Sequence, residues 1–453
     1  MNMYLEKETL TRHVGLEKLM QTSLQGIEQK AKQNKEHKFS NLYELLNEQA
    51  LGYAWRTINK KASAGVDKIT AKEYAVNLTE NISEIVDALK NKRYHAKLVK
   101  RVDIPKGNGK KRPLGIPSVS DKILQNAVTM ILKAIYEPEF LESSYGYRPN
   151  VGAGKAVKDL TKELQFSKYS FIVEADIKGF FDNIDHDWLI KMLEYKINDR
   201  AFIGLIKKWL KAGILDVDGL VKHPITGCPQ GGNISPTLSN IYLHYVLDLW
   251  FEKVVKPKSE GEAYICRYAD DFVCAFRYKR DAQRFYNELP KRLRKFELEL
   301  SLEKTNIISF SRFRKQEKTY FEFLGFEYRW GVSYLGKDII KRRTSRKKLR
   351  QSLGNMKNWC KCIRSKRLVA IIKLLNSKLR GYYNYYGVIG NSKDLNGFYR
   401  ITIKTLYKWL NRRSQRRSFI WIEFKKMIKR YGVITPRITE STNHQIRFDI
   451  CFV

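Results

Sequence analysis

Two adjacent aspartates, Asp270 and Asp271, interrupt the apolar stretch YICRYADDFVCAF at 264–276. Aspartate is common in turns because its side chain accepts hydrogen bonds from nearby backbone N–H groups, which accounts well for one of the two residues. It accounts poorly for both, because neighbouring carboxylates repel each other unless a positive charge lies against them. Divalent cations prefer carboxylate oxygens as ligands, so the pair is a candidate metal site.

A third carboxylate, Asp176, follows the apolar residues at the start of FIVEADIKGFF (171–181). A single aspartate at the end of a strand is most often a turn or capping residue. Two acidic positions at strand ends, one of them doubled, are also what a two-metal phosphoryl-transfer centre requires. Two cations about 4 Å apart can stabilise the attacking and the leaving oxygen of an in-line displacement. That chemistry requires the carboxylates to converge from neighbouring strands.

The residues around these carboxylates predict the elements that position them. β-Branched and aromatic residues at 264–268 and 272–276 favour two short strands. A tight turn between them makes a β-hairpin with the acidic pair at or next to its tip. Residues 169–190 predict a buried strand that leads into a helix, so that Asp176 lies at the strand end. Three polar residues are typical of caps at the start of that helix: Asp182, Asp185 and His186.

Length and composition indicate a folded chain of two or three domains. The 453 residues are 43% hydrophobic and 12% aromatic, which argues against global disorder. No apolar run reaches the roughly 18 residues of a membrane span, and the N-terminus lacks the apolar core of a secretion signal. The six cysteines form no CxxC pair, so neither a zinc ribbon nor a disulfide framework is indicated. We therefore expect a cytoplasmic protein without a membrane partner.

The charge balance is the most pronounced feature of the composition. The chain has 85 Lys and Arg against 47 Asp and Glu, a net charge of +38. Residues 341–380 hold 15 basic and no acidic residues, and extending the range to 430 gives 27 against 2, or +25. A solvated basic face normally carries interspersed acids, so their absence favours phosphate binding. The expected partner is a nucleic acid.

Eight segments resemble, in order, those of reverse transcriptases encoded by bacterial group II introns. They are GVDKIT, VDIPKGNGKKRPLGIP, SSYGYRPN, ADIKGFFDNIDH, GCPQGGNISPTLSNIYL, RYADDFVCAF, LELSLEKTNIISF and FEFLGFEY. They span 65–328, and LLNSKLRGYYNYYG and LYKWLNRR further on resemble the thumb, or maturase, domain of that family. The tetrapeptide YADD alone would be weak support, whereas eight ordered segments are specific.

The resemblance implies an α+β fold: a right-hand polymerase with fingers and an RRM-like antiparallel palm sheet, followed by an all-helical basic thumb/maturase domain. The expected parts are an N-terminal helical extension at 1–60, fingers and palm at 61–340, the thumb at 341–430 and a short tail at 431–453. The implied activity is RNA-dependent DNA synthesis, which adds dNTPs to the 3′-OH of a DNA primer on an RNA template. The implied cofactors are two Mg²⁺ ions, for which Mn²⁺ can substitute.

The resemblance also assigns site residues. The metal ligands would be Asp176, Ile177, Asp270 and Asp271, and the three aspartates would be catalytic. The nucleotide-binding residues would be Lys106, Arg112, Gly179, Phe180, Phe181, Gln230 and Lys304.

These assignments have plainer alternatives. Lys106 and Arg112 would hold the triphosphate, since the arginine fork bonds phosphate oxygens bidentately, but a solvent-facing basic turn has the same composition. Phe181 would be a steric gate that collides with a 2′-hydroxyl, and its alternative is core packing. Lys304 would approach the site from the palm floor, and its alternative is a surface lysine.

Basic residues of the thumb are expected to contact phosphates. The candidates are Arg346, Lys347, Lys348, Arg380, Arg412 and Arg413. Four tyrosines lie just after Arg380, at 382, 383, 385 and 386. Aromatic residues beside basic ones can stack on bases, although at helical spacing they more often belong to a core.

Three functions are compatible with these residues. The first is an intron-type reverse transcriptase that also binds intron RNA and assists splicing. The second keeps the polymerase chemistry but serves phage defence, CRISPR adaptation or DNA repair. The third is an RNA-binding splicing factor with vestigial polymerase activity, against which the intact set of aspartates argues.

The segment PRITESTNHQIRFDICFV at 436–453 has one His and one Cys, too few for the HNH-type endonuclease that many relatives carry. The sequence does not predict an oligomeric state.

Overall fold

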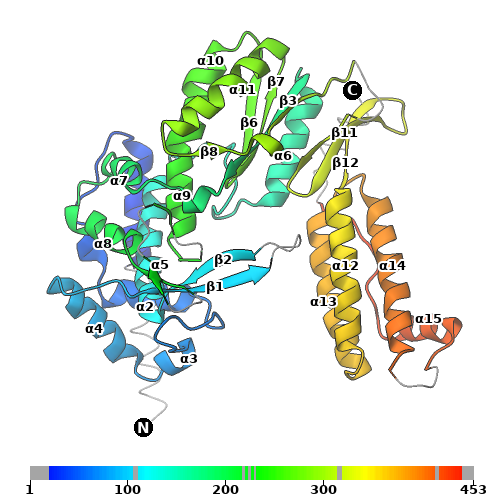
Figure 1. Cartoon of the computed structure of the whole chain (residues 1–453), viewed down its shortest axis with the longest axis horizontal. Helices are drawn as coiled ribbons and strands as arrows, with labels where there is room; N and C mark the ends of the chain where they lie inside the picture. Colours follow the sequence, from blue (N-terminus) through cyan, green and yellow to red (C-terminus); the bar gives the residue numbers. More distant parts are fainter. Residues whose placement is uncertain are drawn as a thin grey trace.

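The computed structural model describes residues 20–105, 111–216, 220–222, 226–228, 231–313, 319–413 and 418–440. Mixed helices and sheets confirm the α+β class. Helices and a small sheet of the N-terminal part, a central antiparallel sheet, and a group of long C-terminal helices follow one another across the molecule (Figure 1).

The N-terminal part is mainly helical, as the sequence predicts, starting with a helix at 20–33. Its further helices are α2 (Glu48–Thr57), α3 (Ala71–Tyr74), α4 (Leu78–Lys90), α5 (Val119–Tyr136) and α8 (Arg200–Leu210). Short polar side chains fix several starts: Thr70 forms a capping box with Glu73, and Ser118 accepts a hydrogen bond from the backbone N–H of Asp121 at 3.1 Å.

A four-stranded sheet of order β2-β1-β4-β5 lies beside these helices. Its strands are β1 (Val99–Pro105), β2 (Lys111–Ile116), β4 (Ile214–Leu215) and β5 (Val221–Lys222). The segment 111–116 is the antiparallel partner of β1, with Ile104 opposite Arg112. Its Gly, Lys and Pro content predicts a turn. The segment forms a strand instead, because pairing with β1 satisfies its backbone hydrogen bonds despite its low strand propensity.

The central sheet has the order β6-β7-β3-β8, and β9 also pairs with β3. The strands are β3 (Phe171–Lys178), β6 (Ala263–Tyr268), β7 (Asp271–Phe276), β8 (Glu299–Leu300) and β9 (Asn306–Ser309). All of their pairings are antiparallel. An antiparallel sheet is what the resemblance implies for the part of the chain that carries the aspartates.

Period-two alternation gives the central sheet two buried faces. Val173 and Phe272 face the core that contains α11 (Lys279–Arg294), whereas Ile172 and Val273 face the core that contains α6 (Ala153–Phe166). Asp176 and Asp271 have the strand parity of Ile172 and Val273. Both therefore belong to the α6 face of the sheet.

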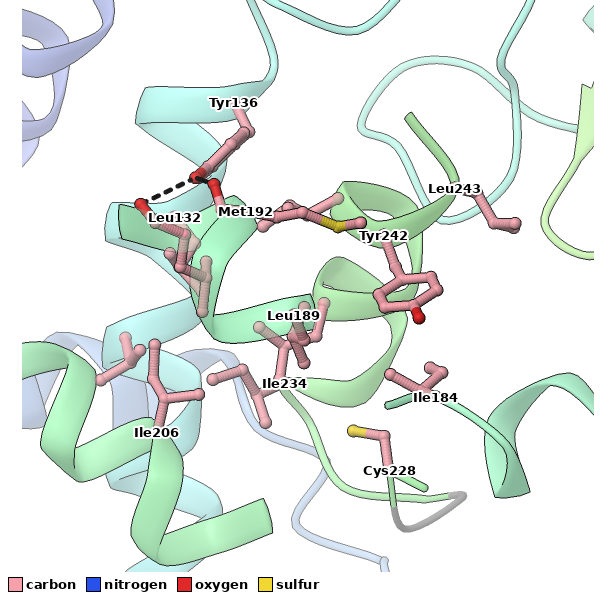
Figure 2. Close-up of a cluster of buried hydrophobic side chains, with 14 of the residues drawn as sticks. Leu132, Tyr136, Ile184, Leu189, Met192, Ile206, Cys228, Ile234, Tyr242 and Leu243 are labelled. Carbon is pink, nitrogen blue, oxygen red and sulfur yellow. Dashed lines mark hydrogen bonds between the residues drawn. The ribbon is translucent and has the colours of Figure 1, made fainter. Parts of the chain in front are cut away.

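Side chains of α7 and α9 pack with those of α5 and α8 in one buried hydrophobic cluster (Figure 2). Their bounds are α7 (His186–Glu194) and α9 (Ser235–Leu243), and α9 continues through π-helical turns at His244–Asp248 and Phe251–Val255 into α10 (Lys256–Lys258). Asp185 caps α7, as predicted, by accepting a hydrogen bond from the backbone N–H of Trp188 at 2.8 Å. In the core, the Tyr136 hydroxyl donates to the carbonyl of Met192 at 3.3 Å. One continuous core thus joins α7 and α9 to the N-terminal helices.

A three-stranded sheet of order β10-β11-β12 leads to the C-terminal helices. Its strands are β10 (Phe321–Phe323), β11 (Phe326–Val332) and β12 (Asp338–Thr344). The helices are α12 (Arg346–Ile363), α13 (Leu368–Tyr386), α14 (Ser392–Leu410) and α15 (Trp421–Arg430). The helical part begins at Arg346 rather than 341 because β12 extends to Thr344, and Ser345 then caps α12. We call α12–α15 the thumb helices.

The thumb helices have a core of their own, built on the buried Leu375, Leu379 and Tyr383. Tyr382 stacks on Phe398 at a centroid distance of 3.7 Å. The tyrosine cluster is therefore mostly core, with Tyr385 the exception at 42% exposure. Within the described ranges, no helix is long and apolar enough to cross a membrane.

Candidate active site

The acidic pair lies at the tip of the predicted hairpin. Tyr268 of β6 pairs with Asp271 of β7, which leaves Ala269 and Asp270 as a two-residue turn. Ala269 has a φ of +57°, a conformation that favours glycine in such turns and is costly for a residue with a Cβ atom. Such a conformation persists where the surroundings hold it, and this clusters at functional sites. Asp270 is thereby fixed at the tip and Asp271 at the first position of β7.

Asp176 lies directly opposite Asp271 in the register between β3 and β7. Directly opposed residues in an antiparallel pair point to the same face, with Cβ atoms about 4.5–5.5 Å apart. Two like charges in this position destabilise a sheet. The expected convergence of Asp176 on the acidic hairpin is confirmed, and the repulsion between the carboxylates requires a compensating charge.

The pKa values of the hairpin aspartates reflect this crowding. Burial, together with the charges of Asp176 and Asp270, raises the pKa of Asp271 to about 7. Burial and the charge of Asp176 also raise the pKa of Asp270, against the opposing charges of Arg112 and Lys304. Carboxylates whose charged form is disfavoured by burial and by each other are stabilised by a bound cation.

Lys304 supplies one positive charge at this site. Its Nζ donates a hydrogen bond to Oδ2 of Asp176 at 2.5 Å, and its side chain is 67% exposed. It belongs to the 3₁₀ turn Leu302–Lys304, between β8 and β9, both of which pair with β3. Lys304 therefore reaches Asp176 from the turn between β8 and β9, and its role in nucleotide binding stays a prediction.

The donor chemistry of the three aspartates fits a hard divalent cation such as Mg²⁺. In the part of the chain that the structure describes, however, no three His, Cys, Asp or Glu side chains are already drawn together as a metal site. Asp176 is engaged with Lys304 instead. Cation binding would therefore involve a local rearrangement of these side chains.

A buried arginine, Arg267, fixes the turn of the hairpin through its hydrogen bonds. Arg267, in β6, has 0% exposure and forms a bidentate ion pair with Asp248 through Nε (2.7 Å) and Nη2 (2.6 Å). Its guanidinium also donates to Oδ1 of Asn240 (3.1 Å), Oγ of Ser144 (2.6 Å) and the carbonyl of Ala269 (3.2 Å). That carbonyl belongs to the peptide that leads into Asp270. One side chain thus ties the turn to α9, to its π-helical extension and to the loop at 143–146.

The loop at 143–146 lies against the turn itself. The backbone N–H of Tyr145 donates to the carbonyl of Arg267 at 2.9 Å, and the Nδ2 of Asn240 donates to the carbonyl of Gly146 at 2.6 Å. A Cβ atom at Gly146 would lie 2.4 Å from the backbone nitrogen of Ala269. Only glycine permits this close approach, which accounts for its presence in SSYGYRPN.

A cavity of about 700 Å³ lies between the β1–β2 hairpin and the palm. We call it the nucleotide cavity. Its lining includes Arg112 of β2, Phe181, Tyr147 and Asn233. The charge of Arg112 acts on both Asp270 and Tyr147, so this cavity adjoins the acidic hairpin. The structure therefore brings Arg112, Phe181 and the aspartates into one region, as the sequence analysis expects.

Phe181 combines packing with access to the cavity. It is 5% exposed, and its ring packs edge-on against the ring of Phe180, with 5.4 Å between the two ring centroids. The backbone N–H of Cys228 donates to the carbonyl of Phe181 at 2.7 Å, which fixes the position of the residue. Phe181 thus belongs to the core and also lines the nucleotide cavity, so its role as a steric gate stays a prediction.

The other predicted site residues divide into three groups. Ile177 and Phe180 are buried, at 2% and 2% exposure, so any contact they make with a ligand goes through their backbone. Gly179 is exposed and has a φ of +56°, which lets β3 turn sharply into the 3₁₀ turn at 180–182. Lys106 and Gln230 lie outside the described residues.

The predicted phosphate-binding residues lie on the thumb surface. All are exposed: Arg346, Lys347, Lys348, Arg380, Arg412 and Arg413. Basic residues in the first turn of a helix are repelled by the positive end of the helix dipole. The first turn of α12 has no acidic residue that would offset this repulsion. The charge of Lys348 acts on Asp271, so the start of α12 lies near the active site. Arg413 has a structural contact as well, since its Nη2 donates to the carbonyl of Lys366 at 3.1 Å.

Sequence reasoning missed Arg267, Asp248 and Tyr147. A signal existed for the first two, because each is a lone charge inside an apolar run, YICRY and YLHYVLDLWF. A charge in a buried segment needs a partner, but nothing in the sequence indicates which partner it finds 19 residues away. Tyr147 has no comparable signal, since its position depends on the loop conformation.

A family model of reverse transcriptases (RNA-dependent DNA polymerases) matches residues 104–328. This range contains the three aspartates, Arg112 and Phe181, and it covers the whole central sheet. The fold, the site and this match define the class of the protein as an RNA-directed DNA polymerase.

Individual relatives narrow the class. Over 464 aligned residues the chain is 32% identical to the group II intron-encoded protein LtrA of Lactococcus lactis subsp. cremoris, and the match covers 83% of this chain and 75% of LtrA. It is 33% identical over 237 residues to protein YkfC of Escherichia coli K12, covering 46% of this chain and 62% of YkfC. It is 29% identical over 138 residues to nuclear intron maturase 4, mitochondrial, of Arabidopsis thaliana, covering 29% of this chain and 16% of the maturase. The chain belongs to the family of group II intron-encoded reverse transcriptases.

Proposed function

We propose that the protein copies RNA into DNA by two-metal phosphoryl transfer at the site formed by Asp176, Asp270 and Asp271. The observation that carries this proposal is the pairing of Asp176 with Asp271 at the base of a turn that presents Asp270. The three carboxylates, with the backbone carbonyl of Ile177, would hold two Mg²⁺ ions, for which Mn²⁺ can substitute. When bound, the ions stabilise charge on the attacking and leaving oxygens.

The residues around the carboxylates would orient the reactants. Arg112 lines the nucleotide cavity and would bond triphosphate oxygens there. Lys106, which is assigned by the resemblance alone, would act with it. Lys304 would release Asp176 when a cation binds, since both compete for the same carboxylate oxygen. Primer extension on an RNA template, with dNTPs and Mg²⁺, tests the proposal directly.

Phe181 would select deoxyribonucleotides over ribonucleotides. Phe181 lines the nucleotide cavity, and its ring would leave no room there for a 2′-hydroxyl. In the Phe181→Ala variant, rNTP incorporation relative to dNTP incorporation should rise by about tenfold or more, in the range of discrimination by pocket shape. Single-nucleotide extension with UTP and dTTP measures the ratio.

Two further measurements distinguish nucleotide selection by Phe181 from a role in core packing alone. Phe181→Tyr keeps the ring and should retain the wild-type ratio, which makes it the matched control. Truncating a buried phenylalanine costs stability, so melting curves accompany the rates. An unchanged UTP-to-dTTP ratio in a folded Phe181→Ala variant would leave Phe181 as a packing residue only.

We also propose that the segment 341–430 supplies most of the affinity for RNA. Its net charge of +25 has no counterpart elsewhere in the chain, and its named basic side chains are exposed. If five to eight of them contact phosphates of a single strand, log K should fall with log salt at a slope of about −3.5 to −6. Phosphate contacts carry no base information, so this affinity should be independent of sequence.

Neutralising Arg346 and Lys347 tests whether the segment 341–430 binds RNA through its basic side chains. The Arg346→Gln/Lys347→Gln variant should lower the salt slope by about 1.4 and weaken binding to all RNA sequences alike. Lys348 stays unchanged, because its charge also acts on Asp271. Filter binding over a salt series measures the slope, and Lys207→Gln/Lys211→Gln, on exposed positions in and just after α8, is the charge-matched control. Equal slopes for wild type and the Arg346/Lys347 variant would refute the assignment.

Assistance of intron splicing is a second function that we propose for the same RNA-binding surface. It is favoured by the similarity to one protein that is named as group II intron-encoded and to another that is named an intron maturase. Binding a folded intron needs the basic surface but no carboxylate chemistry. Variants of the aspartates therefore separate the two functions.

A further inference from the structure

The thumb helices enclose a second hollow, apart from the nucleotide cavity. It has a volume of about 810 Å³ and lies between α14, α15 and the segment that follows α15. Volumes of about 300–1,000 Å³ are typical of ligand sites. In Figure 1, α15 lies on the side of α14 that faces away from the β1–β2 hairpin, which borders the nucleotide cavity. We call it the α14–α15 groove.

Five basic side chains line the α14–α15 groove: Lys393, Arg400 and Lys404 from α14, and Lys425 and Lys429 from α15. All five are exposed. Over the described ranges none of them forms an ion pair, and the lining includes no Asp or Glu. Cations that converge without acids repel one another, and a polyanion relieves that repulsion.

The floor and walls of the groove are apolar and aromatic. Ile403 and Val433 are largely buried, and Tyr399 and Trp421 are half-buried in the wall. The Nζ of Lys425 lies 5.5 Å from the centroid of the Trp421 ring, so a cation and an aromatic face are presented together. Phosphates with bases that are free to stack fit such a surface. A duplex keeps its bases inside, so the surface favours a single strand.

We propose that the α14–α15 groove binds a segment of single-stranded RNA that lies outside the primer–template position. The inference rests on the proposed RNA-binding function of 341–430 and adds to it a defined second site. RNA is the occupant that the activity supplies, because a template longer than the copied region leaves unpaired RNA beside the enzyme. The five cations would contact its phosphates, and Trp421 or Tyr399 would stack on a base.

Gly397 offers a means to block the groove without disturbing the fold. It lines the groove on α14, and a Cβ atom built on it meets nothing within 4 Å. Gly397→Glu would place a carboxylate among the five cations, and glutamate is a better helix former than glycine. Gly354 on α12 is also exposed and equally free of neighbours, but it is not part of the groove. Gly354→Glu is therefore the matched control for charge and helix context.

The experiment uses the full chain with a saturating unlabelled RNA–DNA primer–template and a fluorescent 12-nucleotide oligo(U) RNA. Wild type should still bind the oligo(U) probe under these conditions, as measured by anisotropy. Gly397→Glu should weaken probe binding by about tenfold. Gly354→Glu should bind the probe as wild type does. A Lys404→Glu/Lys425→Glu variant should reproduce the loss from the opposite walls of the groove.

Each contrary outcome has a separate meaning. If primer–template displaces all of the probe from wild type, or if Gly397→Glu binds the probe normally, the groove is not a second RNA site. If Gly354→Glu loses as much affinity as Gly397→Glu, the effect is one of net charge and the groove assignment fails. Tighter binding of a matched oligo(dT) DNA would overturn RNA as the occupant. If wild type binds neither probe nor free RNA, the proposed RNA-binding function itself fails.

Discussion

Primer extension on an RNA template should fall by about 10³-fold in the Asp270→Asn variant, equal to about 4 kcal/mol in the barrier. Asn keeps the shape of the side chain at the turn between β6 and β7 but removes the charge that binds a divalent cation. Gel assays of single-nucleotide incorporation, with Mg²⁺ and with Mn²⁺, measure the loss. Near-normal extension by this variant would show that Asp270 is not a metal ligand.

The same variant should lose no stability, which distinguishes a chemical defect from misfolding. In the metal-free protein Asp270 is half-buried and close to the charge of Asp176, and both effects raise its pKa. A folded-state pKa above the unfolded value means that the folded form binds the extra proton, so stability decreases as pH rises through that range. With EDTA at pH 8, Asp270→Asn should therefore melt no lower than wild type. RNA binding and intron splicing should also persist, because we assign both to the thumb surface.

The acidic hairpin could be predicted because its signals are local. Strand-forming residues on both sides of Asp270–Asp271 fix the turn, and the register then follows from the two-residue loop. The position of Asp176 opposite Asp271 required the resemblance, since nothing in either segment states which strands are neighbours. Charge composition likewise indicated a nucleic-acid-binding segment without showing that α12 begins beside the palm.

Features that depend on tertiary pairing could not be predicted. Residues 111–116 look like a loop and become β2 because β1 offers a partner edge. Residues 338–344 have a basic composition typical of the following helices and instead complete the sheet with β11. The α14–α15 groove is of the same kind, because it needs side chains of two helices that are apart in the sequence. Local propensity determines the secondary structure of such segments only where no neighbouring strand or helix offers a competing contact.

Arg267→Met should destabilise the protein by about 3–5 kcal/mol, because it leaves Asp248 buried without its partner. Asp248 is 1% exposed, so water cannot replace the two hydrogen bonds that it loses. Thermal melting and limited proteolysis of the palm should both show the loss. If Arg267→Met melts as wild type does, the buried pair contributes nothing to the fold.

The double variant Arg267→Met/Asp248→Leu tests whether Arg267 also positions the catalytic turn. Replacing both members of a buried ion pair with apolar side chains is often neutral, so much of the stability should return. Extension should remain at least about tenfold slow, since the tie from Arg267 to the Ala269 carbonyl is gone and Asp270 follows that peptide. Arg267→Lys supplies the complementary comparison, because lysine keeps the charge but cannot reach Asp248, Ser144 and Ala269 at once. Recovery of both melting temperature and extension rate in the double variant would reduce Arg267 to a packing role. Recovery of the melting temperature alone means that the turn needs its tether to present Asp270 to the substrate.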